Sequence, residues 1–130
     1  MKIESEKTQI NKSAQELFSF LSNFNNFEKL MPPQVTNWKS TADDCYFTIN
    51  GMASIGMKII EKNPNTTLKI VSNGKVPFAF TLNINLFEDT PTQTSGQLIF
   101  EADLNPMMAM MVEKPLRNFF NHLALKMKDI

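Results

Sequence analysis

The sequence predicts an α+β domain in which a curved antiparallel sheet of about six to seven strands wraps around one long C-terminal helix. Three observations predict this fold. Apolar side chains recur at every second residue in most segments between residues 35 and 104. From residue 106 onward they recur at helical spacing instead. The length of 130 residues fits a single domain, 1–130, whose core needs neither disulfides nor metal ions.

The N-terminal part predicts one strand and two short helices. Residues 2–10 alternate poorly, so this first strand is expected at a sheet edge or with a bulge. Ser13 and Glu16 have the spacing of a capping box, which predicts a helix that begins after Ser13. Asn23 is a second possible cap, and Pro32-Pro33 ends the helix that follows it, because proline has no amide to donate.

Period-two patterns after the prolines predict the body of the sheet. The expected strands are 35–40, 44–49, 52–61, 66–72, 78–86 and 95–104. Asn50-Gly51 and Asn73-Gly74 favour tight hairpins, since Asn and Gly tolerate positive φ. Residues 88–93 are expected to form a polar loop. In the clearest strand, small or polar residues alternate with Phe78, Phe80, Leu82, Ile84 and Leu86. Such a strand has one buried face and one wet face.

Asn105-Pro106 predicts the start of the last helix, because Asn is a favoured cap and Pro a favoured first residue. Pro115 lies inside this helix and is expected to kink it. An apolar arc covers about half of the helix circumference. Its members are Met108, Met111, Val112, Leu116, Phe119, Phe120, Leu123 and Met127. We expect this arc to face the apolar side of strand 78–86.

Composition excludes several functions. Lys plus Arg equals Asp plus Glu, at 13 each. Without a basic cluster, neither nucleic-acid binding nor adhesion to an anionic membrane is expected. Cys45 is the only cysteine, which excludes an internal disulfide and favours an inert buried thiol in a reducing compartment. With no signal peptide or apolar span, we expect the cytoplasm, and no metal or phosphate motif predicts a cofactor.

The order of elements resembles the helix-grip fold of the SRPBCC superfamily, which includes START domains and the birch-pollen-allergen group. The resemblance covers essentially the whole chain. It rests on the Ser13 capping box before Phe18 and Phe20, the segment 23–33, and Asn105-Pro106 before the last helix. The stretch 104–108 with Pro115-Leu116 resembles a small bacterial subfamily of uncharacterised members.

The resemblance implies a cavity between the sheet and the last helix that binds or transports a lipid, polyketide or similar apolar molecule. No catalytic motif carries over to any residue of this chain. The chain is short for the superfamily, which favours a small or closed cavity. The residues expected to line it are Trp38, Phe47, Ile49, Met57, Ile59, Phe78, Phe80, Leu82, Phe100, Met108, Met111 and Phe119.

Two other functions stay open. A polyketide cyclase or dehydratase would use His122, Asp44 or Tyr46 as a proton donor, and at least one of them would have to point into the cavity. His122 is the only histidine, and a lone histidine is more often structural than catalytic. Alternatively, Met107 and Met110 fall opposite the apolar arc and would form a protein contact or homodimer interface.

Overall fold

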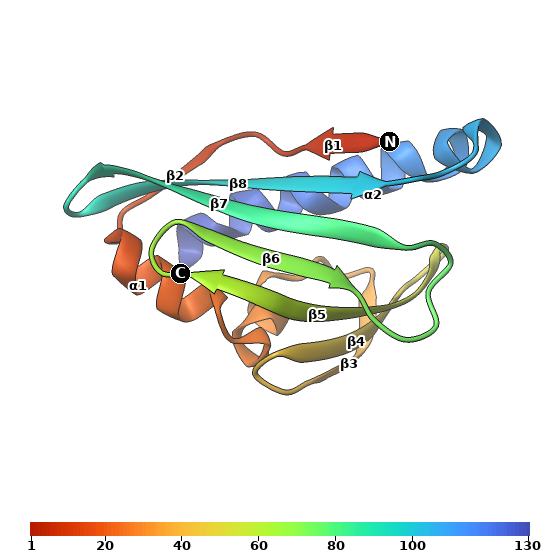
Figure 1. Ribbon diagram of the computed structural model, residues 1–130, viewed down its shortest axis with the longest axis horizontal. Helices are drawn as coiled ribbons and strands as arrows, with labels where there is room; N and C mark the ends of the chain where they lie inside the picture. The colour runs from red at the N-terminus through yellow and green to blue at the C-terminus, as the bar shows by residue number, and fades with distance from the viewer.

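The computed structural model describes residues 1–130 as one antiparallel sheet with two α-helices and two 3₁₀ segments (Figure 1). The strands are β1 (Lys2–Glu4), β2 (Thr8–Ile10), β3 (Val35–Ser40), β4 (Asp44–Ile49), β5 (Ala53–Asn63), β6 (Thr67–Ser72), β7 (Phe80–Thr90) and β8 (Gln93–Ala102). The helices are α1 (Ala14–Leu21), η1 (Phe24–Leu30), α2 (Pro106–Lys126) and η2 (Met127–Asp129). This arrangement confirms the predicted α+β fold.

The sheet has the strand order β1-β8-β7-β6-β5-β4-β3, and β2 also pairs with β8. The expected first strand, 2–10, is therefore an edge segment, and it is split in two at Ser5. The Ser5 amide donates to the Leu98 carbonyl, and the Leu98 amide donates to the Ser5 hydroxyl oxygen, both at 2.9 Å. This side-chain bond interrupts the regular ladder, so the sheet has eight strands where the sequence patterns indicate seven.

Two of the predicted connections are wrong. Asn73-Gly74 makes no tight hairpin, because the Asn73 amide still donates to Gly56 of β5 at 2.9 Å and the chain reaches β7 only at Phe80. The polar loop expected at 88–93 is shorter, since β7 continues to Thr90 across a register shift and β8 resumes at Gln93. Asn50-Gly51 does lie in the short β4–β5 turn, where Gly51 takes a φ of 82°.

Helix α1 begins at the predicted cap, because the Ser13 hydroxyl oxygen accepts a hydrogen bond from the Glu16 amide at 3.1 Å. The return bond of the capping box differs from the usual one. The Glu16 carboxylate accepts from the Ser13 hydroxyl at 3.2 Å, not from the Ser13 amide. Leu17 and Leu21 of this helix are buried against the sheet.

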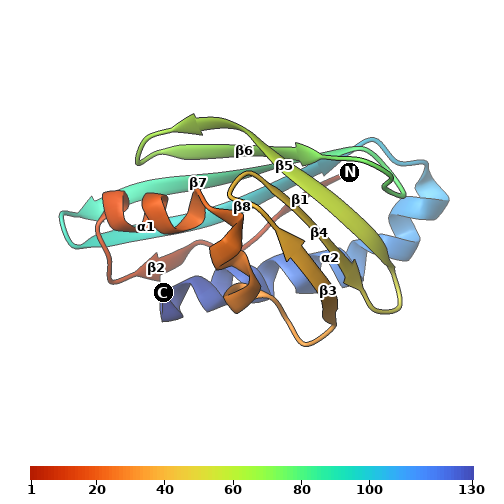
Figure 2. The ribbon, with the colours of Figure 1, turned by 90° about the horizontal axis from the view of Figure 1, so that it is seen from below.

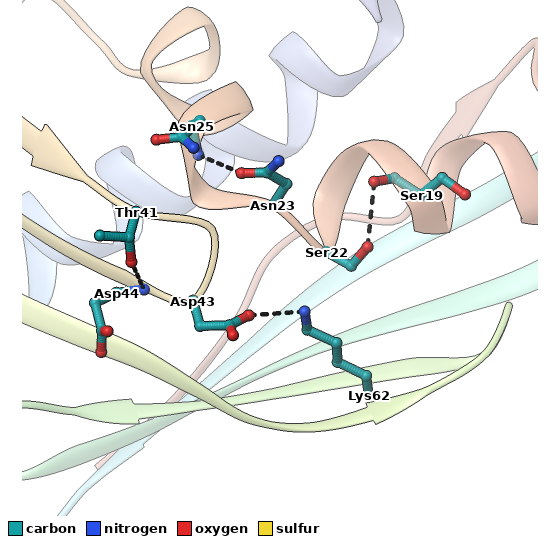
Figure 3. Close-up of polar contacts among 8 residues, drawn as sticks. All are labelled: Ser19, Ser22, Asn23, Asn25, Thr41, Asp43, Asp44 and Lys62. Atoms are coloured by element: carbon teal, nitrogen blue, oxygen red, sulfur yellow. Dashed lines mark hydrogen bonds and ion pairs between the residues drawn. The ribbon is translucent and has the colours of Figure 1, made fainter.

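Polar contacts order η1 and the neighbouring β3–β4 turn; Figure 3 shows the Asn23 cap of η1 and the Asp43–Lys62 ion pair of the turn. Asn23 caps η1 by accepting from the Asn25 amide at 2.9 Å, and the Phe24 amide donates to Ala42 in the β3–β4 turn at 2.8 Å. That turn is tied to β5 by an ion pair of 2.7 Å between Asp43 and Lys62. These contacts also position Pro32-Pro33, which follows η1 directly.

Helix α2 runs along β8 and β1, with its C-terminal end near α1 (Figures 1 and 2). Asn105 caps it as predicted, accepting from the Met108 amide at 2.8 Å. No residue of 106–115 is buried, whereas five are buried after Pro115: Leu116, Phe119, Phe120, Leu123 and Ala124. In both views the first turns of α2 project beyond the strands. No helix of the structure has the length and apolar character needed to cross a lipid bilayer.

Aromatic contacts join the sheet to the docked half of α2. Phe119 stacks on Phe47 of β4 with ring centroids 6.2 Å apart, and Phe120 contacts Phe100 of β8 at 5.0 Å. Phe80 contacts Phe100 at 5.4 Å, which continues the cluster onto β7. The apolar face of β7 and the arc of α2 after Pro115 therefore face each other across one shared core, as predicted.

Candidate ligand-binding site

The space between the sheet and α2 is almost filled by side chains. A wholly apolar gap of about 20 Å³ remains near the middle of α2. It is lined by Phe47, Ile49, Ile55, Met57, Phe78, Phe80, Phe100, Leu116, Phe119 and Phe120. A volume of this size holds about one water molecule. The interior is thus nearly filled, in line with the small cavity that a short chain favours.

Seven of the twelve residues predicted to line a cavity meet around this gap: Phe47, Ile49, Met57, Phe78, Phe80, Phe100 and Phe119. Ile59 and Leu82 are buried elsewhere in the core. Trp38 is half-buried and stacks on Phe47 at 5.2 Å, one layer further out. Met108 is half-buried and packs against the core without reaching the gap.

The placement predicted for Met111 is wrong. Its side chain is 72 % exposed, although the helical wheel puts it on the buried arc. The reason is that packing in this part of α2 is partial: Met108 and Val112 reach the core only in part, and the side of the helix that carries Met111 is left uncovered. Met107 and Met110 are exposed as well, at 74 % and 80 %.

A groove of about 400 Å³ opens on the surface beside this nearly filled interior. It lies between the segment after η1, the β4–β5 turn and the middle of α2. Its walls are Pro32, Pro33, Gln34, Ile49, Asn50, Gly51, Met52, Pro115, Asn118, Phe119 and His122. Ile49 and Phe119 line both the groove and the apolar gap, so these two side chains separate them. No Lys, Arg, Asp or Glu lines the groove.

His122 is one of the groove walls, on the same face of α2 as Asn118 and Phe119. Its Nε2 atom is buried and has no hydrogen-bond partner, and no other buried side-chain nitrogen or oxygen of the protein shares that condition. An unpaired buried polar atom costs about 1–3 kcal/mol, and such atoms call for an explanation in a native structure. The imidazole is therefore the most unusual polar group near the groove.

Asp44 and Tyr46 lie on the opposite face of the sheet from the core. They alternate along β4 with the buried Cys45 and Phe47. Tyr46 is 47 % exposed, and its hydroxyl oxygen accepts from the Asn73 side-chain amide at 2.9 Å. The interpretation of these two residues as proton donors inside a cavity is wrong, which leaves His122 as the only one of the three near the groove.

Cys45 is buried in the core. Burial raises the pKa of its thiol from 9.0 to about 12, and the negative charge of Asp44 acts in the same direction. A hydrogen bond with the Met57 backbone lowers the pKa but does not cancel these effects. The thiol is therefore protonated near neutral pH and is a poor nucleophile.

The polar walls of the groove were not predicted as site residues. Pro32-Pro33 and Asn50-Gly51 carry strong turn signals, and a turn explains each pair without a ligand. The spacing of Pro115, Asn118 and His122 was the available signal. Asn118 lies three residues after Pro115, and His122 lies four residues after Asn118. This spacing places all three on one face of a helix.

No protein-family model matches the chain, and a search of curated proteins finds no match. Solved structures do match. A START superfamily protein from Mycobacterium smegmatis has a TM-score of 0.71 at 14 % identity, over 98 % of this chain and 94 % of that one. A point mutant of norcoclaurine synthase from Thalictrum, in complex with a transition-state analogue, has a TM-score of 0.70 at 12 % identity, over 95 % and 91 %.

One domain of the di-domain aromatase/cyclase BexL, from the BE-7585A biosynthetic pathway, also matches. Its TM-score is 0.67 at 14 % identity, over 95 % of this chain and 45 % of that one. Together these neighbours show that the chain has the helix-grip fold that they share. At such identities the likeness establishes the fold.

Proposed function

We propose that the protein binds a small, largely apolar molecule that enters through the groove and packs against the floor formed by Ile49 and Phe119. One observation carries this proposal: the same two side chains line both the groove and the apolar gap behind it. Ligand sites typically have volumes of about 300–1,000 Å³, and they combine apolar walls with a few polar groups. The groove, at about 400 Å³, fits that description.

The gap of about 20 Å³ is too small to accept a ligand without movement. The side chain best placed to move is Phe119, because it lies between the gap and the open groove. The half of α2 before Pro115 has no buried residue to hold it in place. We therefore propose that binding displaces the Phe119 ring and joins the gap to the groove.

A fluorescence titration with the uncharged probe N-phenyl-1-naphthylamine tests this function. Asn118→Trp places an indole in the groove, whereas Lys128→Trp places one on an exposed site outside it. We expect saturable binding to the wild type and the Lys128→Trp control, and at least tenfold weaker binding to Asn118→Trp. Absence of saturable binding to the wild type, or equal binding to both variants, contradicts the proposal. Native mass spectrometry of the freshly purified protein additionally reports any co-purified molecule.

A cyclase or dehydratase is a second candidate, and the unpaired Nε2 atom of His122 is the observation that favours it. An aromatase/cyclase and a synthase share the fold, which is compatible with chemistry at this position. Incubation with a linear poly-β-ketone, followed by chromatography and mass spectrometry, tests this candidate. Products that form equally with His122→Gln exclude His122 as the proton donor.

A homodimer or protein-interaction module is the third candidate, and the observation that favours it is the exposure of Met107 and Met110. Light scattering over a range of protein concentrations tests it. A homodimer formed through these side chains dissociates when both are replaced by glutamate. A strict monomer at every concentration excludes the homodimer.

A further inference from the structure

We infer that the molecule bound in the groove carries an uncharged hydroxyl group, and that Nε2 of His122 is the hydrogen-bonding anchor for it. This inference rests on the proposed function, because it assigns the polar end of the same ligand. It follows from three features of the site: an unpaired buried nitrogen, walls without charged residues, and apolar surfaces around both.

The unpaired nitrogen stands out because the chain satisfies its other buried polar groups. Ser5 exchanges hydrogen bonds with Leu98, and the Thr94 hydroxyl donates to the Lys12 carbonyl at 2.9 Å. Only His122 Nε2 is buried without a partner, and it lies beside the groove. A ligand that supplies the missing partner removes a cost of about 1–3 kcal/mol. Such a ligand therefore gains affinity that a purely apolar molecule does not.

The chemistry of imidazole selects a hydroxyl group. In neutral histidine one ring nitrogen donates a hydrogen bond and the other accepts one. A hydroxyl group both donates and accepts, so it pairs with Nε2 in either tautomer. A carbonyl oxygen only accepts, and would pair with just one of the two forms.

The walls of the groove disfavour charged ligands. Apart from His122, the side chains there are neutral amides, prolines and apolar groups. A carboxylate or an ammonium group would lose hydration on entry without gaining a counter-charge. Gln34 and Asn118 make no side-chain hydrogen bond within the chain, so they offer further neutral polar contacts.

The orientation of the ligand follows from burial. Nε2 is buried although His122 lines the groove, so a hydroxyl group reaches this atom only when the ligand displaces the side chains that cover it. The apolar body of that molecule then lies against Ile49 and Phe119, where the walls are apolar on the interior side. Pro32 and Pro115 add rigid apolar surface to the walls of the groove.

Three probes with the same ring system test the inference: 2-naphthol, 2-methylnaphthalene and 2-naphthoate. At pH 7 the first is neutral with a hydroxyl group, the second is apolar and the third is an anion. We expect 2-naphthol to bind about tenfold more tightly than 2-methylnaphthalene, which corresponds to about 1.4 kcal/mol. We expect 2-naphthoate to bind most weakly.

Two variants separate the anchor from the cavity. In His122→Leu, the tenfold preference for 2-naphthol over 2-methylnaphthalene should disappear. His122→Gln keeps a hydrogen-bonding group near the position of Nε2 and should recover part of the preference. Because His122 is the only histidine, the imidazole nitrogens give unambiguous NMR signals in the wild type. The Nε2 signal should shift with 2-naphthol and stay in place with 2-methylnaphthalene.

The outcomes distinguish this inference from the proposed function. Equal affinity for 2-naphthol and 2-methylnaphthalene in the wild type, or tightest binding of 2-naphthoate, overturns the hydroxyl anchor while binding at the groove stands. An unmoved Nε2 signal with bound 2-naphthol overturns it as well, even if the leucine variant fails to fold. No saturable binding of any probe overturns both.

Discussion

Replacing Phe119 by alanine removes the ring that separates the groove from the interior, and this change tests the structure most directly. The ring is 7 % exposed and contacts Phe47 at 6.2 Å and Phe120 at 5.3 Å. Loss of such a ring leaves these two neighbours without a partner on one side. Burial of phenylalanine in a core is worth about 3–5 kcal/mol relative to alanine.

We expect Phe119→Ala to lower the free energy of unfolding by about 3 kcal/mol, at the low end of that range. The reason is that one side of the site borders the groove, so water can enter the space left by the ring. With a urea m-value of about 1.5–2 kcal/mol/M, the unfolding midpoint falls by about 1.5–2 M. The variant should also bind 2-methylnaphthalene more tightly than the wild type, because the gap and the groove become continuous.

Urea unfolding followed by far-UV circular dichroism measures the change. Fluorescence of Trp38, the only tryptophan, gives a second probe close to the site, since Trp38 stacks on Phe47. Phe87→Ala is the matched control, because Phe87 is 40 % exposed and its ring makes a cation–π interaction of 4.5 Å with Lys7. An exposed contact of this kind is worth about 0.5–1 kcal/mol. Similar midpoints for the two variants would refute the assignment of Phe119 to the core wall.

Three further predictions concern the scaffold. The Cys45 thiol should resist alkylation at pH 8 until urea unfolds the protein. Its folded pKa of about 12 exceeds the ordinary 9.0, so the unfolded state loses its proton first, and the wild type should lose stability relative to Cys45→Ala between pH 9 and 12. Gly56→Ala should cost about 2–3 kcal/mol in urea titrations, since a Cβ there overlaps the Asn73 carbonyl oxygen. A Cβ at Gly51 meets no atom, so Gly51→Ala should cost only about 1 kcal/mol, which is the cost of its φ of 82°. Equal losses of stability in the two variants would contradict the close approach at Gly56 in β5. Ser13→Ala should cost about 1 kcal/mol by removing the α1 cap, and an unchanged midpoint would show that the cap contributes nothing.

The sequence predicts the core strands well because alternation is a local property. Leu68, Ile70 and Leu82 are all buried where the period-two pattern places them. The caps at Ser13 and Asn105 are also local, since each acts on an amide three residues away. These signals need no knowledge of the rest of the fold.

The errors arise where a distant segment decides the outcome. Asn73 keeps its amide paired with Gly56, so a dipeptide typical of hairpins does not turn there. Met111 has the helical phase of a core residue, but the packing around it leaves its side chain exposed. The groove was missed for the same reason, because its walls come from three separate segments. Only the spacing of Pro115, Asn118 and His122 along α2 was visible beforehand.

The position of β1 and β2 beside β8 has a consequence for synthesis of the chain on the ribosome. Lys2 pairs with Glu101 and Thr8 pairs with Gly96, whereas β3 to β8 each pair with the strand next to them in the sequence. The first ten residues therefore leave the exit tunnel long before their partner strand is made. The meander from β3 to β8 can assemble in order during translation, whereas β1 and β2 have no partner strand until β8 is made. Contacts of such long sequence separation slow folding, so this edge of the sheet forms late in the nascent protein.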